Sequence, residues 1–259
     1  MTNADVLKVA LRQSALESGC APEDFLSGKN KVVLSQKAQG ARAYLDLPFF
    51  CDLTTYGSGV VASVSPAICR EVQAYLDARP AFAGFEMPAL HELDTVLKPH
   101  GMCVCFMAEY FLPDISRLAV QNCAFTLRLL TPEQFAPYYL PQWSNALCAE
   151  RSSLDMLAVG AFDGGQLIGL AGASADCETM WQIGVDVLPP YRRCGVASAL
   201  TSRLAQEILA RGRVPFYCCA WSNIASARNA QKSGFSPAWV QITAKSRQFT
   251  KELLQKQKK

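Results

Sequence analysis

The stretch "VDVLPPYRRCGVASAL", from Val185 to Leu200, changes its character several times over a short length. It begins as an apolar strand, and two prolines end that strand because proline cannot donate to a sheet ladder. Two arginines and a glycine follow, and the remaining residues are small or apolar, as in a buried helix. A strand that feeds a helix through a short turn points the first N–H groups of that helix at the turn. Those groups and the helix dipole attract anions, so this turn is a candidate anion site.

The residues of the turn suit a diphosphate. The small or slim side chains from Gly195 to Ser198 let a ligand approach the backbone closely. Arg192 and Arg193 add positive charge in a planar form that suits phosphate oxygens. Neither GxxxxGKS/T nor GxGxxG, the common phosphate loops, occurs in the sequence. The stretch therefore predicts a different kind of diphosphate turn. The alternative interpretation is a plain strand-to-helix turn whose arginines lie in solvent.

The sequence around this stretch alternates between strand and helix patterns. Asp163-Gly164-Gly165 separates two apolar runs, which is a strong hairpin signal. Strands are expected at 125–130, 156–162, 166–175, 180–188, 214–221 and 235–243, with helices beginning near 131, 196 and 223. This order predicts a mixed α/β domain of the α+β type, with a largely antiparallel sheet flanked by helices.

The first half of the chain predicts a second α/β domain. Helices are expected at 1–19, 66–78 and 88–101, and strands at 31–35, 41–47, 49–57, 60–65 and 102–111. The segment from 112 to 122 begins with Leu-Pro-Asp and is typical of a domain junction. The predicted domains are therefore residues 1–120, of unclear role, and residues 121–259. The basic end from 245 to 259 is expected to be a solvated helix or a frayed tail.

Composition excludes several classes of protein. Half of the residues are hydrophobic and 18% are charged, which permits a folded core. A net charge of +3 is too small to argue for nucleic acid, and no apolar run is long enough to span a membrane. The eleven cysteines include no CxxC pair, so we expect no metal site and a reduced, cytoplasmic protein.

A second pattern follows the turn after one more strand. Arg192, Gly195 and Ala197 fit Q/R-x-x-G-x-G/A, and Val187-Leu188-Pro189 precedes them. "NIASARNAQKSGF", from Asn223 to Phe235, fits N-x-A-S-x-R-x-A-x-K-x-G-F. With both motifs in this order, residues 125–243 resemble the GCN5-related N-acetyltransferases (GNAT).

The resemblance implies that the protein binds acetyl-CoA as cosubstrate and needs no metal. Backbone groups of three strand residues would bind the pantetheine arm: Val185, Asp186 and Val187. Arg192 and the amides of the turn would bind the pyrophosphate: Arg193, Cys194, Gly195, Val196, Ala197 and Ser198. Three residues of the second motif would contact the cofactor or keep the strands apart: Asn223, Ser226 and Asn229.

The resemblance also implies direct transfer of acetyl to the amine of a small-molecule or peptide acceptor, without a covalent enzyme intermediate. Glu178 is the first choice for the base, Asp176 and Glu150 are alternatives, and Asp186 could face either way. Many relatives carry a tyrosine where this sequence has Ala230, so either the CoA thiolate leaves without an acid or Tyr217 or Tyr191 substitutes as acid.

The chain further resembles a two-part subset of the family, in which an N-terminal α/β half of obscure role precedes the acetyltransferase half. That half could be a degenerate copy of the same fold, and it would shape the acceptor site or join two copies into a homodimer. The alternative function is a CoA-binding regulatory or scaffold protein that lacks an acid and a base.

Overall fold

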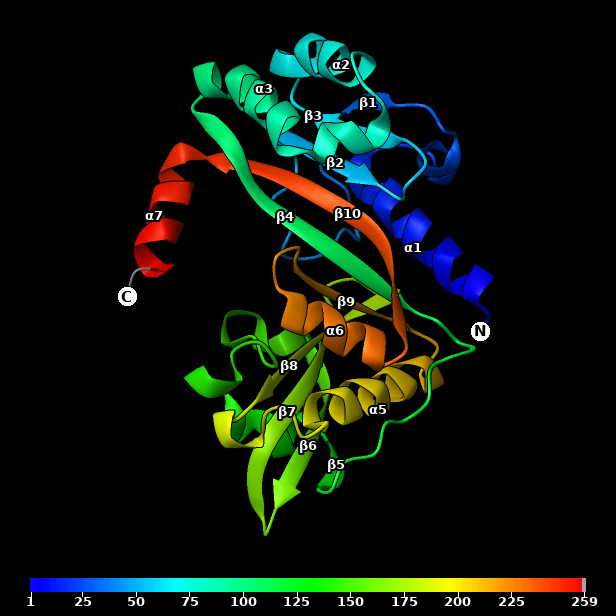
Figure 1. Cartoon of the computed structure of the whole chain (residues 1–259), viewed down its shortest axis with the longest axis vertical. Coiled ribbons are helices and arrows are strands. Elements are labelled where there is room, and N and C mark those ends of the chain that lie inside the picture. The colour runs from blue at the N-terminus through cyan, green and yellow to red at the C-terminus, as the bar shows by residue number, and fades with distance from the viewer. Residues whose placement is uncertain (258–259) are drawn as a thin grey trace. The chain divides into compact units, whose positions relative to one another are not determined.

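The computed structural model describes residues 1–257 and divides into two compact units. Unit 1 contains Met1–Ala10 and Tyr110–Pro237, and unit 2 contains Leu11–Glu109 and the chain from Ala238 onward. Figure 1 traces the chain. Strands β4 (Met102–Pro113) and β10 (Phe235–Ser246) each begin in one unit and end in the other. The predicted boundary after residue 120 lies inside unit 1, and as a domain assignment it stays a prediction.

Unit 1 is built on a mixed sheet, as predicted. Its strands run in the order β4-β9-β8-β7-β6-β5, and β8 and β9 are parallel while β5, β6, β7 and β8 pair antiparallel in sequence. The bounds are β5 (Thr126–Leu130), β6 (Asp155–Asp163), β7 (Gln166–Ser174), β8 (Met180–Val187) and β9 (Val214–Ala220). Gly164 and Gly165 turn the β6–β7 hairpin with φ of 51° and 94°, a conformation that favours glycine.

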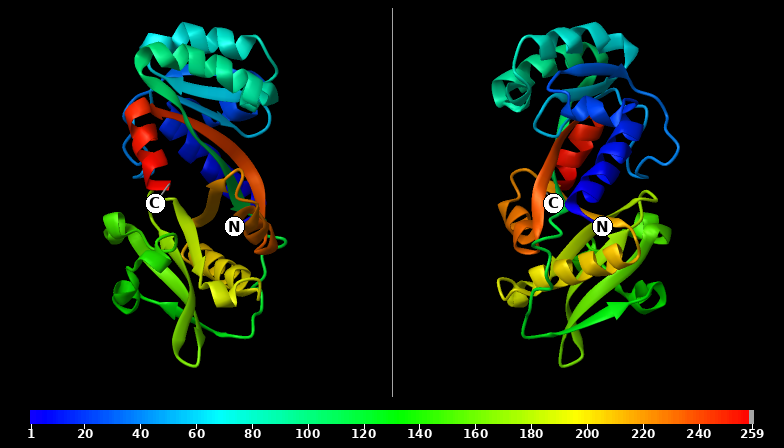
Figure 2. Two further views of the ribbon diagram at one scale, coloured as in Figure 1. Left: turned by 60° about the vertical axis from the view of Figure 1, so that its left-hand side comes forward. Right: turned by 90° about the vertical axis from the view of Figure 1, so that its right-hand side faces the viewer.

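The two faces of this sheet bury different side chains, because residues alternate along a strand. Val159 packs with Leu200 of α5 (Val196–Ala210), whereas its neighbour Ala158 packs with Phe135 and Trp143. Figure 2 shows α5 lying along the sheet. The α5 face also receives α6 (Ile224–Lys232), and the opposite face carries α4 (Pro132–Phe135), η5 (Ala136–Tyr138) and η6 (Pro141–Trp143). Two short turns complete the unit, η7 (Ala149–Leu154) and η8 (Pro189–Tyr191).

Unit 2 is a second α/β layer, which also agrees with the sequence. Its strands run in the order β1-β3-β2-β10-β4, with β1 (Lys31–Leu34), β2 (Cys51–Thr55) and β3 (Val60–Val64). Its helices are the second half of α1 (Asn3–Ser18), α2 (Cys69–Asp77), α3 (Met87–Leu97) and α7 (Arg247–Gln257), with turns η1 (Pro22–Leu26), η2 (Pro66–Ile68), η3 (Ala81–Phe85) and η4 (Lys98–His100). Leu76 of α2 and Leu93 of α3 pack with Leu53 and Ala62 of the strands.

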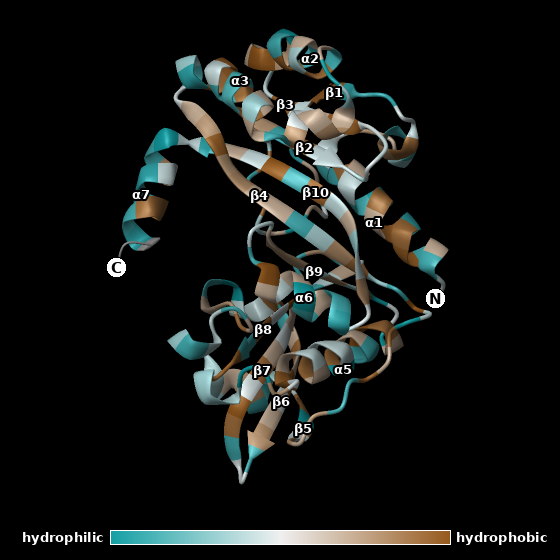
Figure 3. Cartoon of the chain, viewed as in Figure 1, coloured by the Kyte–Doolittle hydropathy of each residue, from teal (hydrophilic) through white to brown (hydrophobic). Residues whose placement is uncertain are grey.

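Figure 3 colours the chain by hydropathy and shows brown and teal alternating along α1, as in an amphipathic helix. Within residues 1–257 no helix is long and apolar enough to cross a bilayer. In the same range no group of three or more His, Cys, Asp or Glu side chains is placed to hold a metal ion.

The expected strand at 41–47 is wrong, since these residues form an irregular segment. The backbone N–H of Arg42 donates to Glu17 Oε1 at 3.0 Å, and the N–H of Leu45 closes a turn onto the carbonyl of Arg42. These donors are therefore not available to a sheet ladder. The apolar residues of the segment suggested a strand. A local sequence pattern gives no information on a hydrogen-bond partner such as Glu17, which lies in another helix.

Unit 2 also buries charged side chains. Glu17 and Arg42 are each 3% exposed and form an ion pair with Nη2–Oε2 and Nε–Oε1 distances of 2.7 and 2.9 Å. Asp52 of β2 is 1% exposed and accepts hydrogen bonds from Gln241 Nε2 at 2.9 Å and Thr243 Oγ1 at 2.7 Å. Both groups link elements that are far apart in the sequence.

The burial of Asp52 makes the stability of unit 2 depend on pH. Desolvation raises the pKa of Asp52 to about 6, although hydrogen bonds from Thr243 and Gln241 oppose the shift. Because the folded pKa lies above the unfolded value of about 3.9, the folded state holds a proton between about pH 4 and pH 6 that the unfolded state has lost. The free energy of unfolding should therefore fall by about 2 kcal/mol as pH rises through this window. Urea unfolding across the window measures the fall, and Asp52→Asn, which does not titrate, should remove it. An equal fall in Asp52→Asn would contradict the assignment.

Candidate functional site

A cleft opens where two parallel strands part. β8 and β9 pair from Met180 and Val214 to Ile183 and Tyr217, and the register ends there. Beyond this point the strands enclose a cleft of about 620 Å³, lined by the end of β8, the end of β9 and the start of α6. The backbone groups of β8 that face this opening have no partner on β9, so they can pair with an extended ligand.

The turn that follows β8 borders the same cleft. Arg192 Nε donates to the carbonyl of Val187 at 3.0 Å, which holds the guanidinium beside the end of β8. Arg193 has φ of 66°, and Gly195 has φ of 81° as the N-cap of α5. The first N–H groups of α5 have no acceptor within the helix and point toward this turn. Arg192 and Ala197 line the cleft, so a cation and the positive end of a helix dipole meet there.

Other residues of the turn can offer only backbone groups. Val196 is 1% exposed and packs in the core of unit 1, and Ser198 Oγ donates to the carbonyl of Gly195 at 3.0 Å. Cys194 is exposed, and its thiol contacts the carbonyl of Arg192 at 3.5 Å. Five of the predicted turn residues are absent from the lining of the cleft: Arg193, Cys194, Gly195, Val196 and Ser198.

The start of α6 forms the opposite wall. Asn223 caps this helix by accepting from the N–H of Ser226 at 3.1 Å, and Ser226 Oγ shares a hydrogen bond of 2.8 Å with the Tyr217 hydroxyl. Asn229 Nδ2 donates to Thr201 Oγ1 of α5 at 3.1 Å. Burial raises the pKa of Tyr217, so its hydroxyl keeps its proton at neutral pH. The cleft lining therefore contains Asn223, Ser226, Asn229 and Tyr217 together.

Asp186 has a role that the sequence left open. Its carboxylate accepts from the N–H groups of Asn145 and Ala146 at 2.8 and 3.0 Å, and from Asn145 Nδ2 at 2.6 Å. It therefore fixes the loop 143–147 over the sheet. The loop also lies against two glycines: a Cβ on Gly184 would be 1.7 Å from the carbonyl oxygen of Asn145, and one on Gly172 would be 2.0 Å from that of Ala146.

Gly184→Ala should displace this loop, because no backbone shift of a few tenths of an ångström relieves so short a contact. We expect a loss of about 2 kcal/mol in the free energy of unfolding, as for an overpacked core, and altered protection of loop amides in hydrogen exchange. Gly84→Ala is the matched control, since its new Cβ would meet nothing closer than 3.9 Å. Equal stability of the two variants would count against the contact.

The structure separates two of the predicted bases, Glu178 and Asp176, from the cleft. The carboxylate of Glu178 is 84% exposed and lies 3.7 Å from Arg213, before the start of β8, whereas the cleft opens toward the end of that strand. Asp176 is buried against Arg151, with an Nε–Oδ1 distance of 3.1 Å. Neither carboxylate lines the cleft. The geometry thus gives no support to Glu178 as the base.

The two candidate acids, Tyr191 and Tyr217, also differ in whether they line the cleft. Tyr191 is bound to Asp163 of the hairpin at 3.1 Å and does not line the cleft, whereas Tyr217 does. Ala230 is fully buried in the core, so no side chain from this position of α6 reaches the cleft.

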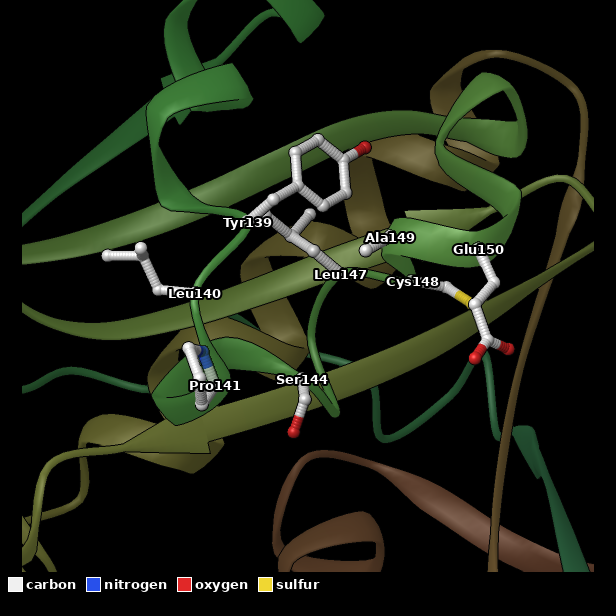
Figure 4. A pocket seen from close by; sticks show the side chains of 8 residues that line it. All are labelled: Tyr139, Leu140, Pro141, Ser144, Leu147, Cys148, Ala149 and Glu150. Carbon is white, nitrogen blue, oxygen red and sulfur yellow. The ribbon is translucent and has the colours of Figure 1, made fainter.

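A second cavity, of about 460 Å³, is drawn in Figure 4, and its lining shares the loop 143–147 with that of the cleft. Ser144 and Leu147 line this cavity, while Asn145 lines the cleft. Glu150, one of the alternative bases, lines it as well. Sequence reasoning missed this loop and, in the cleft, Gln182, Gly184 and Cys218. Glycine in the middle of the apolar strands at 172 and 184 was the available signal, since such a glycine often marks close approach of another backbone.

Residues 123–235 match the family model described as "Acetyltransferase (GNAT) family". Similar solved structures include a putative GNAT acetyltransferase from Novosphingobium aromaticivorans (21% identity, TM-score 0.43, 56% of this chain and 66% of that chain). Others are a GCN5-related N-acetyltransferase-like protein from Streptococcus suis (20%, 0.45, 60% and 68%) and a GCN5-related N-acetyltransferase from Kribbella flavida (17%, 0.48, 60% and 63%). The chain thus spans about two thirds of the length of these proteins. No curated protein matches the chain.

Proposed function

From the premise that residues 123–235 form a domain of the acetyltransferase (GNAT) family, we propose that this protein transfers acetyl from acetyl-CoA to an amine. The observation that carries the proposal is the cleft between β8 and β9, with Arg192 and the N-terminus of α5 at its border. An extended, anionic ligand fits this arrangement, because unpaired strand backbone and a positive helix end lie along one groove.

The residues of the cleft suit the parts of CoA. The N–H groups from Gly195 to Ser198 and the guanidinium of Arg192 would hold the diphosphate. The backbone of Val185 and Val187 would bind the pantetheine arm in the manner of a strand. Asn223, through its cap of α6, and Asn229, through Thr201, would keep the opposite wall in place.

Bound acetyl-CoA supplies the thioester: an acyl carbon–nitrogen bond forms, the carbon–sulfur bond breaks, the amine gives up one proton and the CoA sulfur takes up one. A backbone N–H of β8 near Gly184 would donate to the developing oxyanion, which is worth a few kcal/mol in a dry site. The Tyr217 hydroxyl, held by Ser226, is the proton donor that we assign to the sulfur.

Tyr217→Phe should lower kcat by about tenfold and leave the affinity for CoA within about twofold. The loss is modest because a thiol pKa near 8.5 already makes the thiolate a fair leaving group. Steady-state kinetics and calorimetry with CoA measure the two effects. Ser226→Ala, which removes only the partner of the hydroxyl, should cost less. An unchanged kcat in Tyr217→Phe would remove tyrosine from the mechanism.

The experiment for the function itself combines acetyl-CoA with a panel of amines. A thiol assay measures the release of CoA, and mass spectrometry identifies the acetylated amine. A reaction with acetyl-CoA but no amine measures the rate of hydrolysis. We expect release that depends on the amine. Tight binding of CoA without release of thiol from acetyl-CoA would favour the second candidate, a regulatory or scaffold protein. The alanine at position 230 and the distance of Glu178 from the cleft also favour this candidate.

We further propose a cytoplasmic location and a homodimer. The eleven cysteines, all within the described residues, are thiols and not disulfides, which fits a reducing compartment. Light scattering on the purified chain tests the dimer, and a monomer at micromolar concentration would contradict it.

A further inference from the structure

The cavity beside the cleft has apolar walls. The ring of Tyr139, Pro141 and Leu147 line it, together with Leu140 and Ala149. Leu147 is 3% exposed, and the Tyr139 ring packs edge-on against Phe135 at 6.3 Å between centroids, so this wall is fixed by the core of unit 1. Such a surface binds hydrocarbon in preference to polar groups.

One side chain of formal charge lines the cavity, the carboxylate of Glu150. This side chain has no ion-pair or hydrogen-bond partner among residues 1–257. No lysine or arginine belongs to the lining, and the adjacent Arg151 is bound to Asp176 at 3.1 Å. Figure 4 shows the carboxylate of Glu150 and the hydroxyl of Ser144 pointing the same way, away from the Tyr139 ring. The charge of the cavity is therefore negative.

The Tyr139 hydroxyl is bonded to groups outside the cavity lining. It donates to Oδ2 of Asp155 at 3.0 Å, and Asp155 is 3% exposed. The charged acceptor that the cavity offers to a ligand is therefore the carboxylate of Glu150, and such a group pairs with an ammonium group.

We propose that this cavity holds the body of the acceptor and that Glu150 binds a second positive charge, so that the preferred acceptors are diamines with an apolar chain. The inference rests on the proposed function. The reacting amine lies at the Ser144 end, next to Asn145 of the cleft lining, and forms the bond to the acyl carbon as the carbon–sulfur bond breaks. Its proton passes to solvent water and the CoA sulfur takes a proton from Tyr217, while the distal ammonium keeps its proton and stays on Glu150.

Three acceptors of equal chain length test the proposal: 1,6-diaminohexane, hexylamine and 6-aminohexanoate. They differ only in the charge at the distal end. Glu150 is exposed, so we expect kcat/KM to fall in that order by about fivefold per step, the upper end for an exposed charge interaction. Glu150→Gln should bring the diamine to within about twofold of hexylamine, and Glu150→Lys should make 6-aminohexanoate the best of the three. Glu133→Gln, an exposed carboxylate outside the cavity, should keep the wild-type order.

Two kinetic results would overturn the proposal. An unchanged order in Glu150→Gln would mean that the carboxylate does not touch the acceptor. An equal loss for all three acceptors would mean that Glu150 is a base for the reacting amine instead. Calorimetry without acetyl-CoA separates this inference from the proposed function. The diamine should bind the wild type more tightly than hexylamine does, and more tightly than it binds Glu150→Gln, even if no amine is acetylated. Equal binding of the diamine by the wild type and Glu150→Gln would contradict this inference. A lack of acetyl transfer with binding as expected would contradict only the proposed function.

Discussion

Gly195→Glu should lower the affinity for CoA by at least about a hundredfold. The new side chain has room, because a Cβ at this position would meet only the carbonyl oxygen of Asn122 at 3.7 Å. The loss comes from two other sources. A glutamate at φ of 81° is strained by about 1 kcal/mol, and its carboxylate occupies the positive helix end that we assign to the diphosphate. Isothermal calorimetry with CoA measures the loss.

Gly212 provides the matched control at the opposite end of the same helix. It has φ of 72°, nothing lies within 4 Å of its Cβ position, and it follows the C-terminal turn of α5. Gly212→Glu therefore carries the same strain and the same charge at a distance from the cleft, and should bind CoA as the wild type does. Gly195→Ala separates strain from charge and should lose much less affinity than Gly195→Glu. Wild-type affinity in Gly195→Glu would show that the turn does not hold the phosphates.

Glu17→Ala should cost unit 2 about 3 to 5 kcal/mol of its free energy of unfolding. The substitution leaves the guanidinium of Arg42 buried with its main counter-charge removed, and such a charge is far more costly than the lost bond alone. Urea unfolding followed by far-UV circular dichroism measures the change.

Asp24→Ala is the control for this experiment, because it breaks an ion pair with Lys31, whose side chain is 45% exposed, and one hydrogen bond from the N–H of Ala21. Surface pairs contribute about 0 to 1 kcal/mol and such a cap about 1 kcal/mol, so Glu17→Ala should cost more. A second variant, Glu17→Leu with Arg42→Met, removes both charges and should recover part of the stability. Equal losses in Glu17→Ala and Asp24→Ala would argue that water reaches the buried pair.

Local signals were enough for most of unit 1. The hairpin at Gly164-Gly165, the periodic apolar positions of α5 and the motif that caps α6 each act within a few residues, and the structure contains all three. The segment 41–47 failed for the opposite reason. Its conformation depends on Glu17, which lies in another helix, and no local pattern reports such a partner.

In the candidate site, too, local motifs were predictable from the sequence and contacts between distant segments were not. The turn around Gly195 is a local motif, so its residues could be named from the sequence. The base could not, because strand direction decides which carboxylates reach the cleft: Glu178 precedes β8, and the four strand residues before Gly184 span roughly 13 Å. The loop 143–147 meets β8 through Gly184 and Asp186, and this contact exists only in three dimensions.

The path of β10 has a consequence for synthesis. In the sheet of unit 2 this strand lies between β2 and β4, yet it follows the whole of unit 1 in the chain. When the ribosome has completed residue 109, only the strands on either side of β10 have been made. The sheet becomes continuous when residues 238–246 emerge. Until then the edges of β2 and β4 are exposed to other chains, which is a known route to aggregation. The two edges therefore stay without their partner strand for as long as unit 1 is being made.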